Sequence, residues 1–297
     1  MSNLWKRILV AVIGVPVLII LILLGGWYLF GLVLVLSELC IYEYNQMAKK
    51  KLAAPIEILT YILNCVFLLG IRLCLSVEYS DKFVAFVFAF VILAACSVFI
   101  LNLWNRQGGA IENISAGIVP LAYLTIPFAA MMIISDFGTF VRHVLCFDRL
   151  SISYILDYQW HYFTLAVFVT IWASDTFAYF VGRAIGKHKF FERISPKKTW
   201  EGAIGGFIGA VAVFLLMVSR LCGDVFSYSA FAVVTAVVAT LAAVSGDLVE
   251  SLMKRDAGVK DSSNLIPGHG GVLDRFDSAI LAFPAVLFCL LVYILVC

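Results

Sequence analysis

The chain is far too apolar to be a soluble globular protein. Hydrophobic residues make up 63% of its 297 residues, charged residues only 13%, and the mean hydropathy is +1.03, well outside the composition of soluble domains. These values exclude the soluble classes and predict an all-α protein that crosses a membrane several times. The formal net charge of +2 says little about partners, so the positions of the charges matter more.

Apolar windows of about 17–22 residues, the length that a membrane-spanning helix needs, recur along the chain. They predict nine spans, at residues 8–24, 27–47, 57–75, 83–103, 117–134, 163–182, 203–222, 229–247 and 278–296. The first window has a basic flank and no small-residue cleavage site, so we expect a retained helix and not a removed signal peptide. Gly25-Gly26 is so short a connection that the first two spans should be antiparallel neighbours.

Lys and Arg are distributed unevenly between the two predicted sides of the membrane. If the N-terminus lies in the cytoplasm, 16 of the 21 Lys and Arg residues fall on the inner side, as the positive-inside rule requires. The C-terminus is then outside. We divide the chain into an N-terminal region, 1–160, with about five spans and an outer loop, and a C-terminal catalytic region, 161–297, with about four spans and cytoplasmic polar loops.

Two features suggest structure more than chemistry. The eight cysteines form no C-x-x-C pair, so we expect neither a zinc site nor a disulfide framework. The longest outer loop, at about 135–162, mixes charged residues with Tyr and Trp, which is typical of an aromatic belt at the membrane surface.

The polar segment 251–277, SLMKRDAGVKDSSNLIPGHGGVLDRFD, interrupts the apolar second half. Its glycines allow the backbone to approach a ligand closely and to adopt positive φ. Asp274 and Asp277 stand at i, i+3 where the next helix is expected to begin, so their carboxylates share one face. Paired carboxylates beside a glycine-rich turn suit a divalent ion and phosphates. The alternative interpretation is a solvated connector between two spans.

Three further acids are predicted at membrane depth. Asp175 lies about two turns inside the sixth span, where an ionised carboxylate is costly unless it is paired or bound to a metal. Glu38 and Glu43 lie in the second span, and such groups usually face a cavity. Glu43 is close to the inner end of its span, so its side chain could instead reach water.

A strongly basic loop, 183–202, follows the sixth span. Ser195 and Thr199 can donate hydrogen bonds, Lys197 and Lys198 supply positive charge, and the N-terminus of the next helix favours an anion. These features predict a phosphate site, although positive-inside charge and attraction to anionic lipids explain the bases equally well. Small residues spaced for close packing of the next helix follow, at Gly202, Gly205, Gly206 and Gly209.

The polar groups of the second half should meet at the inner membrane surface. If the helix of the eighth span continues beyond Asp247, one of its faces carries Asp247, Glu250, Ser251 and Lys254. That face emerges near the basic loop and the segment 251–277. Acids for a metal and bases for phosphates, placed at a lipid interface, imply phosphate chemistry on a lipid headgroup.

Three blocks resemble the phosphatidate cytidylyltransferase (CDP-diacylglycerol synthase) family. The segment 251–277 resembles the family's signature, and SDTFAYFVGR (174–183) and ISPKKTWEG (194–202) are similar to two further blocks. The likeness covers about residues 172–278, and the first 160 residues resemble the family mainly in hydropathy. The resemblance implies a reaction at the cytoplasmic face, in which CTP and phosphatidic acid give CDP-diacylglycerol and pyrophosphate.

The resemblance also implies roles for individual residues. Asp247 and Asp274 would hold Mg²⁺, and a second, monovalent cation, K⁺, is expected at the same centre. The catalytic residues would be Asp247, Asp274, Asp277, Lys260 and Arg275. The substrate-binding residues would be Asp175, Ser195, Lys197, Lys198, Thr199, Lys254, Arg255, His269, Gly270 and Gly271. Because the attacking phosphate oxygen is already anionic, positioning and charge neutralisation should suffice without a strong general base.

Three other functions remain open at this stage. A secondary transporter should show an inverted repeat and polar residues near the midplane, and we find no repeat. A lipid-alcohol kinase that uses CTP would release CDP, and the complete HGGxxDRxD block argues against it. A non-catalytic membrane scaffold would leave Asp175 unexplained. We expect a bacterial inner-membrane enzyme, embedded in the lipid bilayer as a possible homodimer, with no nucleic-acid partner.

Overall fold

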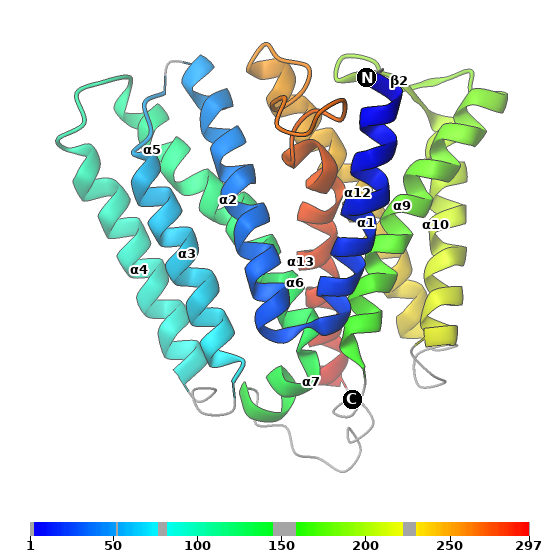
Figure 1. Cartoon of the computed structure of the whole chain (residues 1–297), viewed down its shortest axis with the longest axis horizontal. Helices are drawn as coiled ribbons and strands as arrows, with labels where there is room; N and C mark the ends of the chain where they lie inside the picture. Colours follow the sequence, from blue (N-terminus) through cyan, green and yellow to red (C-terminus); the bar gives the residue numbers. More distant parts are fainter. Residues whose placement is uncertain (1–2, 52, 77–81, 145–158, 222–229, 297) are drawn as a thin grey trace.

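Long apolar helices, aligned roughly side by side, make up most of the computed structural model of this chain (Figure 1). The structure describes residues 3–51, 53–76, 82–144, 159–221 and 230–296. Within these ranges, eight helices are long and apolar enough to cross a membrane, and α1 (Asn3–Leu24) runs beside them. The prediction of an all-α polytopic membrane protein is therefore confirmed.

The first half of the bundle contains four of the long spans. They are α2 (Gly26–Lys50), α3 (Glu57–Cys74), α4 (Phe83–Asn102) and the continuous span Ala110–Ser135. The last of these consists of α5 (Ala110–Pro120), the π-helical turn η2 (Leu121–Thr125) and α6 (Ile126–Ser135). The short elements α7 (Phe137–Thr139) and η3 (Phe140–Val144) follow it.

The second half contains the other four spans and a small sheet. The spans are α9 (Trp160–Ile185), α10 (Trp200–Leu221), α12 (Ala230–Asp256) and α13 (Leu273–Val296). Between α9 and α10, strands β1 (Lys189–Phe191) and β2 (Ser195–Thr199) pair antiparallel. The sequence predicted only a basic loop in this segment, and the strand pairing is an addition from the structure.

Helix α12 extends beyond the predicted end of its span at residue 247 and reaches Asp256. The helix can continue because the added residues are mostly good helix formers with Val, Leu and Met among the charges. It ends where Gly258 adopts a positive φ of 69°, a common way to terminate a helix. The expected shared face of Asp247, Glu250 and Lys254 therefore exists.

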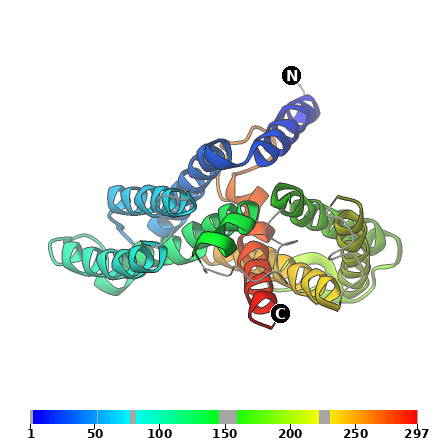
Figure 2. The same ribbon diagram turned by 90° about the horizontal axis from the view of Figure 1, so that it is seen from below.

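The two views together show how the helices are grouped (Figures 1 and 2). Helices α9, α10 and α12 form one side of the bundle, α3, α4 and α5 form the other, and α6 and α13 pack between them. The labels of the two termini lie at opposite ends of the bundle (Figure 1). The N-terminus, the β-hairpin and the loop 257–272 share one end, which is uppermost in Figure 1 and is called the upper end below.

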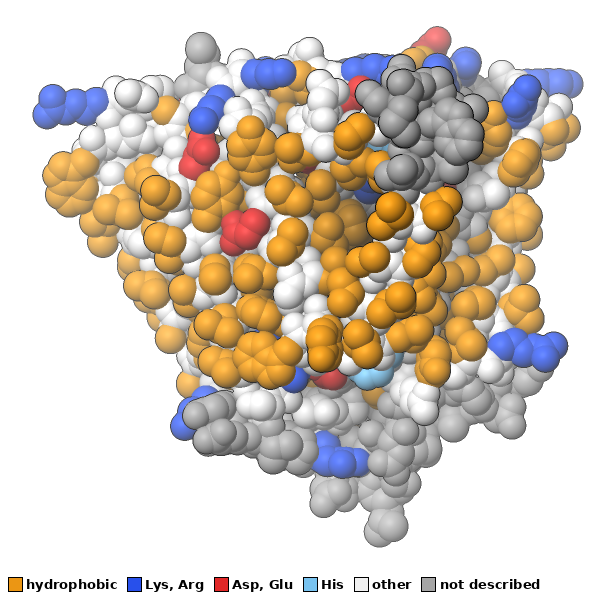
Figure 3. Space-filling model, in the orientation of Figure 1, with side chains coloured by type: hydrophobic (Ala, Val, Ile, Leu, Met, Phe, Trp, Pro, Cys, Tyr) orange, Lys and Arg blue, Asp and Glu red, His pale blue; other side chains and the backbone are white. Residues whose placement is uncertain are grey.

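A belt of apolar side chains surrounds the visible face between two rims where Lys and Arg appear (Figure 3). Large side chains in the belt are strongly exposed, for example Phe88 at 68% and Ile92 at 63%. Exposure on this scale would be unfavourable in water but is favourable against lipid chains. The belt is therefore the surface that faces the bilayer.

At the lower end, polar contacts join four helices. The Arg72 guanidinium forms an ion pair with Asp136 at 2.6 Å and lies 5.4 Å from the centre of the Trp27 ring. The Ser135 hydroxyl and His161 Nδ1 are 2.8 Å apart. Much of the predicted outer loop, residues 145–158, lies outside the described residues, so its expected aromatic belt stays a prediction.

Small residues let α9 and α10 pack closely, as the sequence predicted. A Cβ atom at Gly206 would lie 2.7 Å from the Ser174 carbonyl oxygen and 2.9 Å from the Ala178 Cβ. Gly205 and Gly209 face Val181 and Phe177 in the same way. The close approach fixes the helix that carries Asp175 against the helix that follows the β-hairpin.

We expect Gly206→Ala to destabilise the protein, because the added methyl group must push α9 and α10 apart. Overpacking of this kind costs about 1–3 kcal/mol. Gly31→Ala is the matched control, since a Cβ there meets nothing within 4 Å and alanine favours a helix. Thermal unfolding in detergent should show a lower midpoint for Gly206→Ala only; equal midpoints for the two variants would contradict the packing argument.

Candidate functional site

Three carboxylates from three helices come together near the upper end. Asp175 comes from α9, Asp247 from α12 and Asp277 from the first turns of α13, and they repel one another electrostatically. Two bases offset part of this charge. Lys198 of strand β2 forms an ion pair with Asp247, and Arg275 and Lys198 both attract Asp175.

A cavity of about 360 Å³ opens beside these acids on the side of the β-hairpin. Its charged wall contains Arg183, Lys197 and Lys198, and its aromatic side chains are Tyr179 and Phe190. We call it the basic cavity. Its charge and shape suit a polyphosphate attached to a flat ring system.

The basic cavity owes its shape to the way the hairpin is fixed. The Glu201 carboxylate accepts hydrogen bonds from the backbone N–H groups of Lys187 and His188 and lies 2.6 Å from the His188 ring nitrogen. Thr199 Oγ1 accepts a hydrogen bond from Gly202 N at 3.2 Å, so it caps the first turn of α10. These contacts hold the hairpin, with the two lysines of β2, against the start of α10.

A second cavity, of about 560 Å³, lies on the other side of the acids. Most of its wall is apolar and comes from α1, α2 and α9, including Leu18, Leu32, Leu36, Phe168, Ile171 and Trp172. Its polar part is formed by Asp274, Asp277, Arg275 and His269. We call it the apolar cavity. Such a combination of a long apolar wall and a charged end suits a lipid with a polar headgroup.

The two cavities meet at Asp175 and Asp247, which line both of them. A ligand in the basic cavity and a ligand in the apolar cavity would therefore approach each other at these carboxylates. The anionic groups of the two ligands would come close together only at this point, where both acidic and basic side chains are present. This junction is the place where the structure can support a transfer between two bound molecules.

Asp274, at the start of α13, is held by three N–H donors and by the Ser262 hydroxyl, which it shares with Glu43. Its Oδ2 atom accepts bonds from Gly271 N at 2.7 Å and from the Ser262 N and Oγ atoms at 3.0 Å each. Its Oδ1 atom accepts a bond from Lys254 Nζ at 2.6 Å. Lys254 also forms an ion pair with the fully buried Glu250. Binding a cation to Asp274 would require exchange of the Lys254 contact.

Glu43 of α2 holds the loop 257–272 in place from the other half of the chain. Its carboxylate is completely buried and accepts bonds from Val272 N at 2.8 Å and Leu273 N at 2.7 Å. The hydroxyls of Ser262 and Ser263 donate to it at 2.8 and 2.6 Å. Glu43 thus caps the first amide groups of α13, where a negative charge is favourable.

This function of Glu43 was not deduced from the sequence. Only its carboxylate at membrane depth pointed to a functional group, and the alternative that it reaches water is wrong because its exposed fraction is 0%. Its partners lie about 220 residues away in the chain, and nothing in the local sequence identifies them.

The glycines of the loop bring its backbone close to protein carboxylates. Pro267 and Gly268, with a φ of 81°, occupy the middle of a type II turn closed by His269 N and Ile266 O at 2.9 Å. A Cβ at Gly270 would lie 2.7 Å from Asp274 Oδ2, and one at Gly271 would collide with Glu43 and Ser262. The expected contact of Gly270 and Gly271 with a nucleotide is untested, but their contact with these carboxylates explains why glycine is needed.

Six predicted site residues do not line the basic or the apolar cavity. Three of them, Lys254, Gly270 and Gly271, lie against Asp274, and the other three lie elsewhere. Among the described residues that line the basic and apolar cavities, Ser195, Lys260 and Arg255 do not occur. Arg255 donates from Nε to Ile194 O at 3.4 Å and from Nη1 to Val259 O at 3.2 Å, and it lines a separate cavity. The positions of Ser195, Lys260 and Arg255 therefore do not support their predicted roles in substrate binding or catalysis.

A divalent cation would fit the donor atoms at the junction. In the part of the chain that the structure describes, no three His, Cys, Asp or Glu side chains are arranged as a complete metal site. Mg²⁺ at phosphate-transfer sites usually takes one or two carboxylates, and substrate oxygens and water complete its shell. Carboxylates that converge from α9, α12 and α13 supply the required oxygens and an excess of negative charge.

Comparisons with known proteins agree over nearly the whole chain. The model of the cytidylyltransferase family matches residues 5–293. A phosphatidate cytidylyltransferase of Synechocystis is 32% identical over 291 residues, which cover 95% of this chain and 94% of that protein. One of Bacillus subtilis is 29% identical over 99% of this chain and 100% of its own length. One of Haemophilus influenzae is 43% identical, over 52% of this chain and 55% of its own length.

We expect Glu43→Gln to lower the free energy of unfolding by roughly 2–5 kcal/mol, because the glutamine NH₂ group would face donors that then lose their acceptor. Glu38→Gln is a matched control on the same helix. Glu38 accepts a bond from Asn64 at 2.9 Å, which the glutamine oxygen can replace. Chemical or thermal unfolding in detergent should separate the two variants. Equal stability would show that Glu43 does not anchor the loop.

Proposed function

The chain belongs to the cytidylyltransferase family, and we propose that it transfers the cytidylyl group of CTP to phosphatidic acid, giving CDP-diacylglycerol and pyrophosphate. The observation that carries this proposal is the pair of cavities that share Asp175 and Asp247. One cavity suits a nucleoside triphosphate and the other suits a phospholipid. Their junction is where the α-phosphate of one and the headgroup phosphate of the other would react.

CTP binds in the basic cavity. Lys197, Lys198 and Arg183 contact its triphosphate, where charge-assisted hydrogen bonds are strongest. The aromatic rings of Tyr179 and Phe190 flank the base. Lys198 now pairs with Asp247, so it would exchange this partner for a phosphate oxygen when the nucleotide enters.

Phosphatidic acid binds in the apolar cavity. Its acyl chains lie along the apolar wall between α1, α2 and α9, where their burial provides the binding energy. Arg275 lies at the polar end, and its guanidinium is held by a bond from Nη2 to the His269 carbonyl oxygen at 2.8 Å. It would orient the lipid phosphate toward the junction.

The reaction needs positioning and charge neutralisation more than proton transfer. An anionic oxygen of the lipid phosphate attacks the α-phosphorus of CTP, a P–O bond forms, and the bond to pyrophosphate breaks. Lys198 and Arg275 reduce the repulsion between the two anions, and the walls of the cavities align them for in-line displacement. No side chain has to remove a proton from the nucleophile.

Mg²⁺ is the cofactor that this chemistry calls for. When bound, it neutralises phosphate charge and stabilises the departing pyrophosphate. Asp247 and Asp274 are the proposed ligands, and both line the apolar cavity. Asp175 and Asp277 lie beside them as further carboxylates. A second monovalent cation, K⁺, remains a prediction from the resemblance.

The proposal extends to the protein's surroundings. The chain is a multi-pass membrane protein with relatives in bacteria, and we place it in the bacterial inner membrane with its upper end in the cytoplasm, where CTP is present. A homodimer and the absence of a nucleic-acid partner remain predictions.

The position of a label after turnover tests the reaction directly. Purified protein receives phosphatidic acid, Mg²⁺ and CTP labelled at either the α- or the γ-phosphate. We expect the α-label in a chloroform-soluble lipid and the γ-label in pyrophosphate. A γ-label in the lipid would contradict the proposal and indicate a CTP-dependent lipid kinase.

We expect Asp247→Asn to reduce kcat by about 10²-fold or more, because it removes charge from the junction where both phosphates react. Glu38→Gln, which leaves both cavities intact, should keep wild-type turnover. Initial rates at saturating CTP and phosphatidic acid measure the effect. A loss of less than tenfold for Asp247→Asn would rule out the proposed role.

A further inference from the structure

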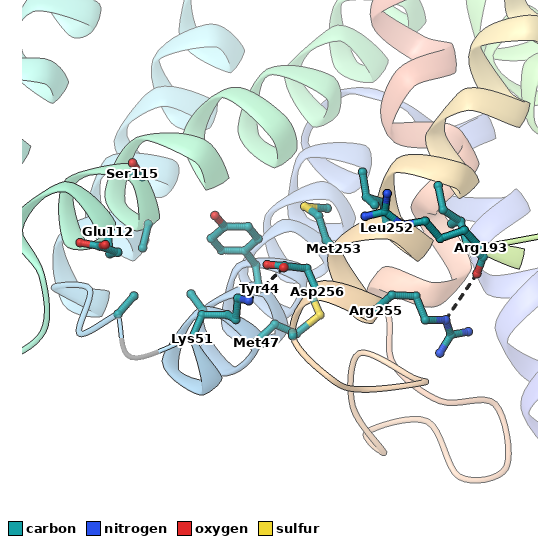
Figure 4. Close-up of a pocket in the computed structure, with 15 residues that line it drawn as sticks. Tyr44, Met47, Lys51, Glu112, Ser115, Arg193, Leu252, Met253, Arg255 and Asp256 are labelled. Atoms are coloured by element: carbon teal, nitrogen blue, oxygen red, sulfur yellow. Dashed lines mark hydrogen bonds and ion pairs between the residues drawn. The ribbon is translucent and has the colours of Figure 1, made fainter. Parts of the chain in front are cut away.

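A third cavity, of about 730 Å³, lies at the upper end between the two halves of the chain. Its walls come from the last turns of α2, the first turns of α5, the turn of the β-hairpin and the end of α12 (Figure 4). Of the described residues that line it, none lines the basic or the apolar cavity. The proposed reaction leaves this cavity without a function.

The charges in this third cavity are arranged asymmetrically. Arg193 and Arg255 line the side formed by the hairpin turn and the end of α12, with their guanidinium groups directed apart, whereas Glu112 lies on the opposite side (Figure 4). Between them, Lys51 Nζ and Asp256 Oδ1 form an ion pair at 2.9 Å, so these two charges offset each other. The side with the two arginines therefore keeps a local positive charge.

The two guanidinium groups differ in how firmly they are held. Arg255 is fixed by its bonds to the carbonyl oxygens of Ile194 and Val259. Arg193 is exposed, and its side chain forms no ion pair or hydrogen bond with the other described residues. Because the Arg193 side chain is exposed, a change of its rotamer can bring its guanidinium toward that of Arg255. The planar donor geometry of the two groups then matches the oxygens of a phosphate.

The remaining wall is apolar and adaptable. Met47, Leu252, Met253 and Ile194 line it, and the ring of Tyr44 stands among them. Methionine side chains adjust readily to ligands of irregular shape. Because its lining residues come from the ends of α2, α5 and α12, the cavity lies at the upper end of the bundle, where a lipid headgroup or a soluble anion can approach it.

We propose that this cavity is a second phosphate-binding site, separate from the reaction cavities, in which Arg193 and Arg255 bind the phosphate group of a lipid headgroup or of a soluble phosphate ester. Arg255 lines this cavity and not the reaction cavities, so the proposed site gives its side chain a ligand at the position it occupies. It also explains why a large, partly apolar cavity at the upper end contains two arginines.

Binding here would also affect the reaction site. Arg193 belongs to the turn that precedes β2, which carries Lys197 and Lys198, and Arg255 belongs to the last turn of α12, which carries Asp247. A phosphate held by both arginines would join the hairpin to α12. This consequence rests on the proposed function and should appear as a lower KM for CTP, with little change in kcat.

Direct binding tests the site without relying on catalysis. Native mass spectrometry of the purified protein would count adducts of phosphatidylglycerol in one arm and of glycerol phosphate in the other. We expect Arg193→Gln/Arg255→Gln to weaken binding in at least one arm by about tenfold. The matched control is Lys50→Gln/Arg106→Gln, which removes the same charge from exposed residues of the upper end outside this cavity.

The single variant Arg193→Gln shows whether weaker binding results from misfolding of the double variant. Because the Arg193 side chain is exposed at a turn, this variant should fold normally and should also bind the phosphate more weakly. Loss in the lipid arm alone identifies a headgroup, and loss in both arms identifies a soluble ester as a sufficient ligand. Equal adducts in wild type and all variants, or equal loss in the control, would overturn the proposal. A binding result that holds while label transfer fails would leave this site intact and reject only the proposed reaction.

Discussion

A buried carboxylate in the first half of the chain determines the shape of the site in the second half. Glu43 accepts four hydrogen bonds from the loop 257–272 and the start of α13. A buried charge is stable only when it is fully bonded, so the loop must close around it. Ser262 contacts both Glu43 and Asp274, and its single hydroxyl hydrogen can serve only one of them at a time. The position of Asp274 is therefore coupled to α2.

From this anchor the other parts of the site follow. The closed loop sets the start of α13 and so places Asp277 and Arg275 at the polar end of the apolar cavity. The close packing of α9 on α10 places Asp175, and the hairpin held by Glu201 places Lys198 against Asp247. The basic cavity and the apolar cavity then share two acids, Asp175 and Asp247. A membrane enzyme that joins a water-soluble anion to a lipid needs such a junction, because neither substrate is soluble in the other's surroundings.

The sequence predicted some of these features and not others, for physical reasons. Span positions follow from hydropathy, and the meeting of Asp175, Asp247 and Asp277 follows from helical spacing and a common membrane side. The continuation of the eighth-span helix beyond Asp247, expected from the spacing of its polar residues, is confirmed by α12, which reaches Asp256. The contact between Glu43 and Val272 joins residues 229 positions apart, and the third cavity arises where four elements meet. Contacts of this kind depend on tertiary packing, which local patterns do not encode.

Hydrogen–deuterium exchange along the loop measures the effect of Glu43 most directly. In wild type and in Glu38→Gln, the amides of Val272 and Leu273, which donate to Glu43, and of Gly271, which donates to Asp274, should exchange slowly. In Glu43→Gln they should exchange at least about tenfold faster, which corresponds to about 1.4 kcal/mol of lost protection, while α9 and α10 keep theirs. Unchanged protection of the loop in Glu43→Gln, or a loss spread evenly over all helices, would contradict the conclusion that this one carboxylate organises the site.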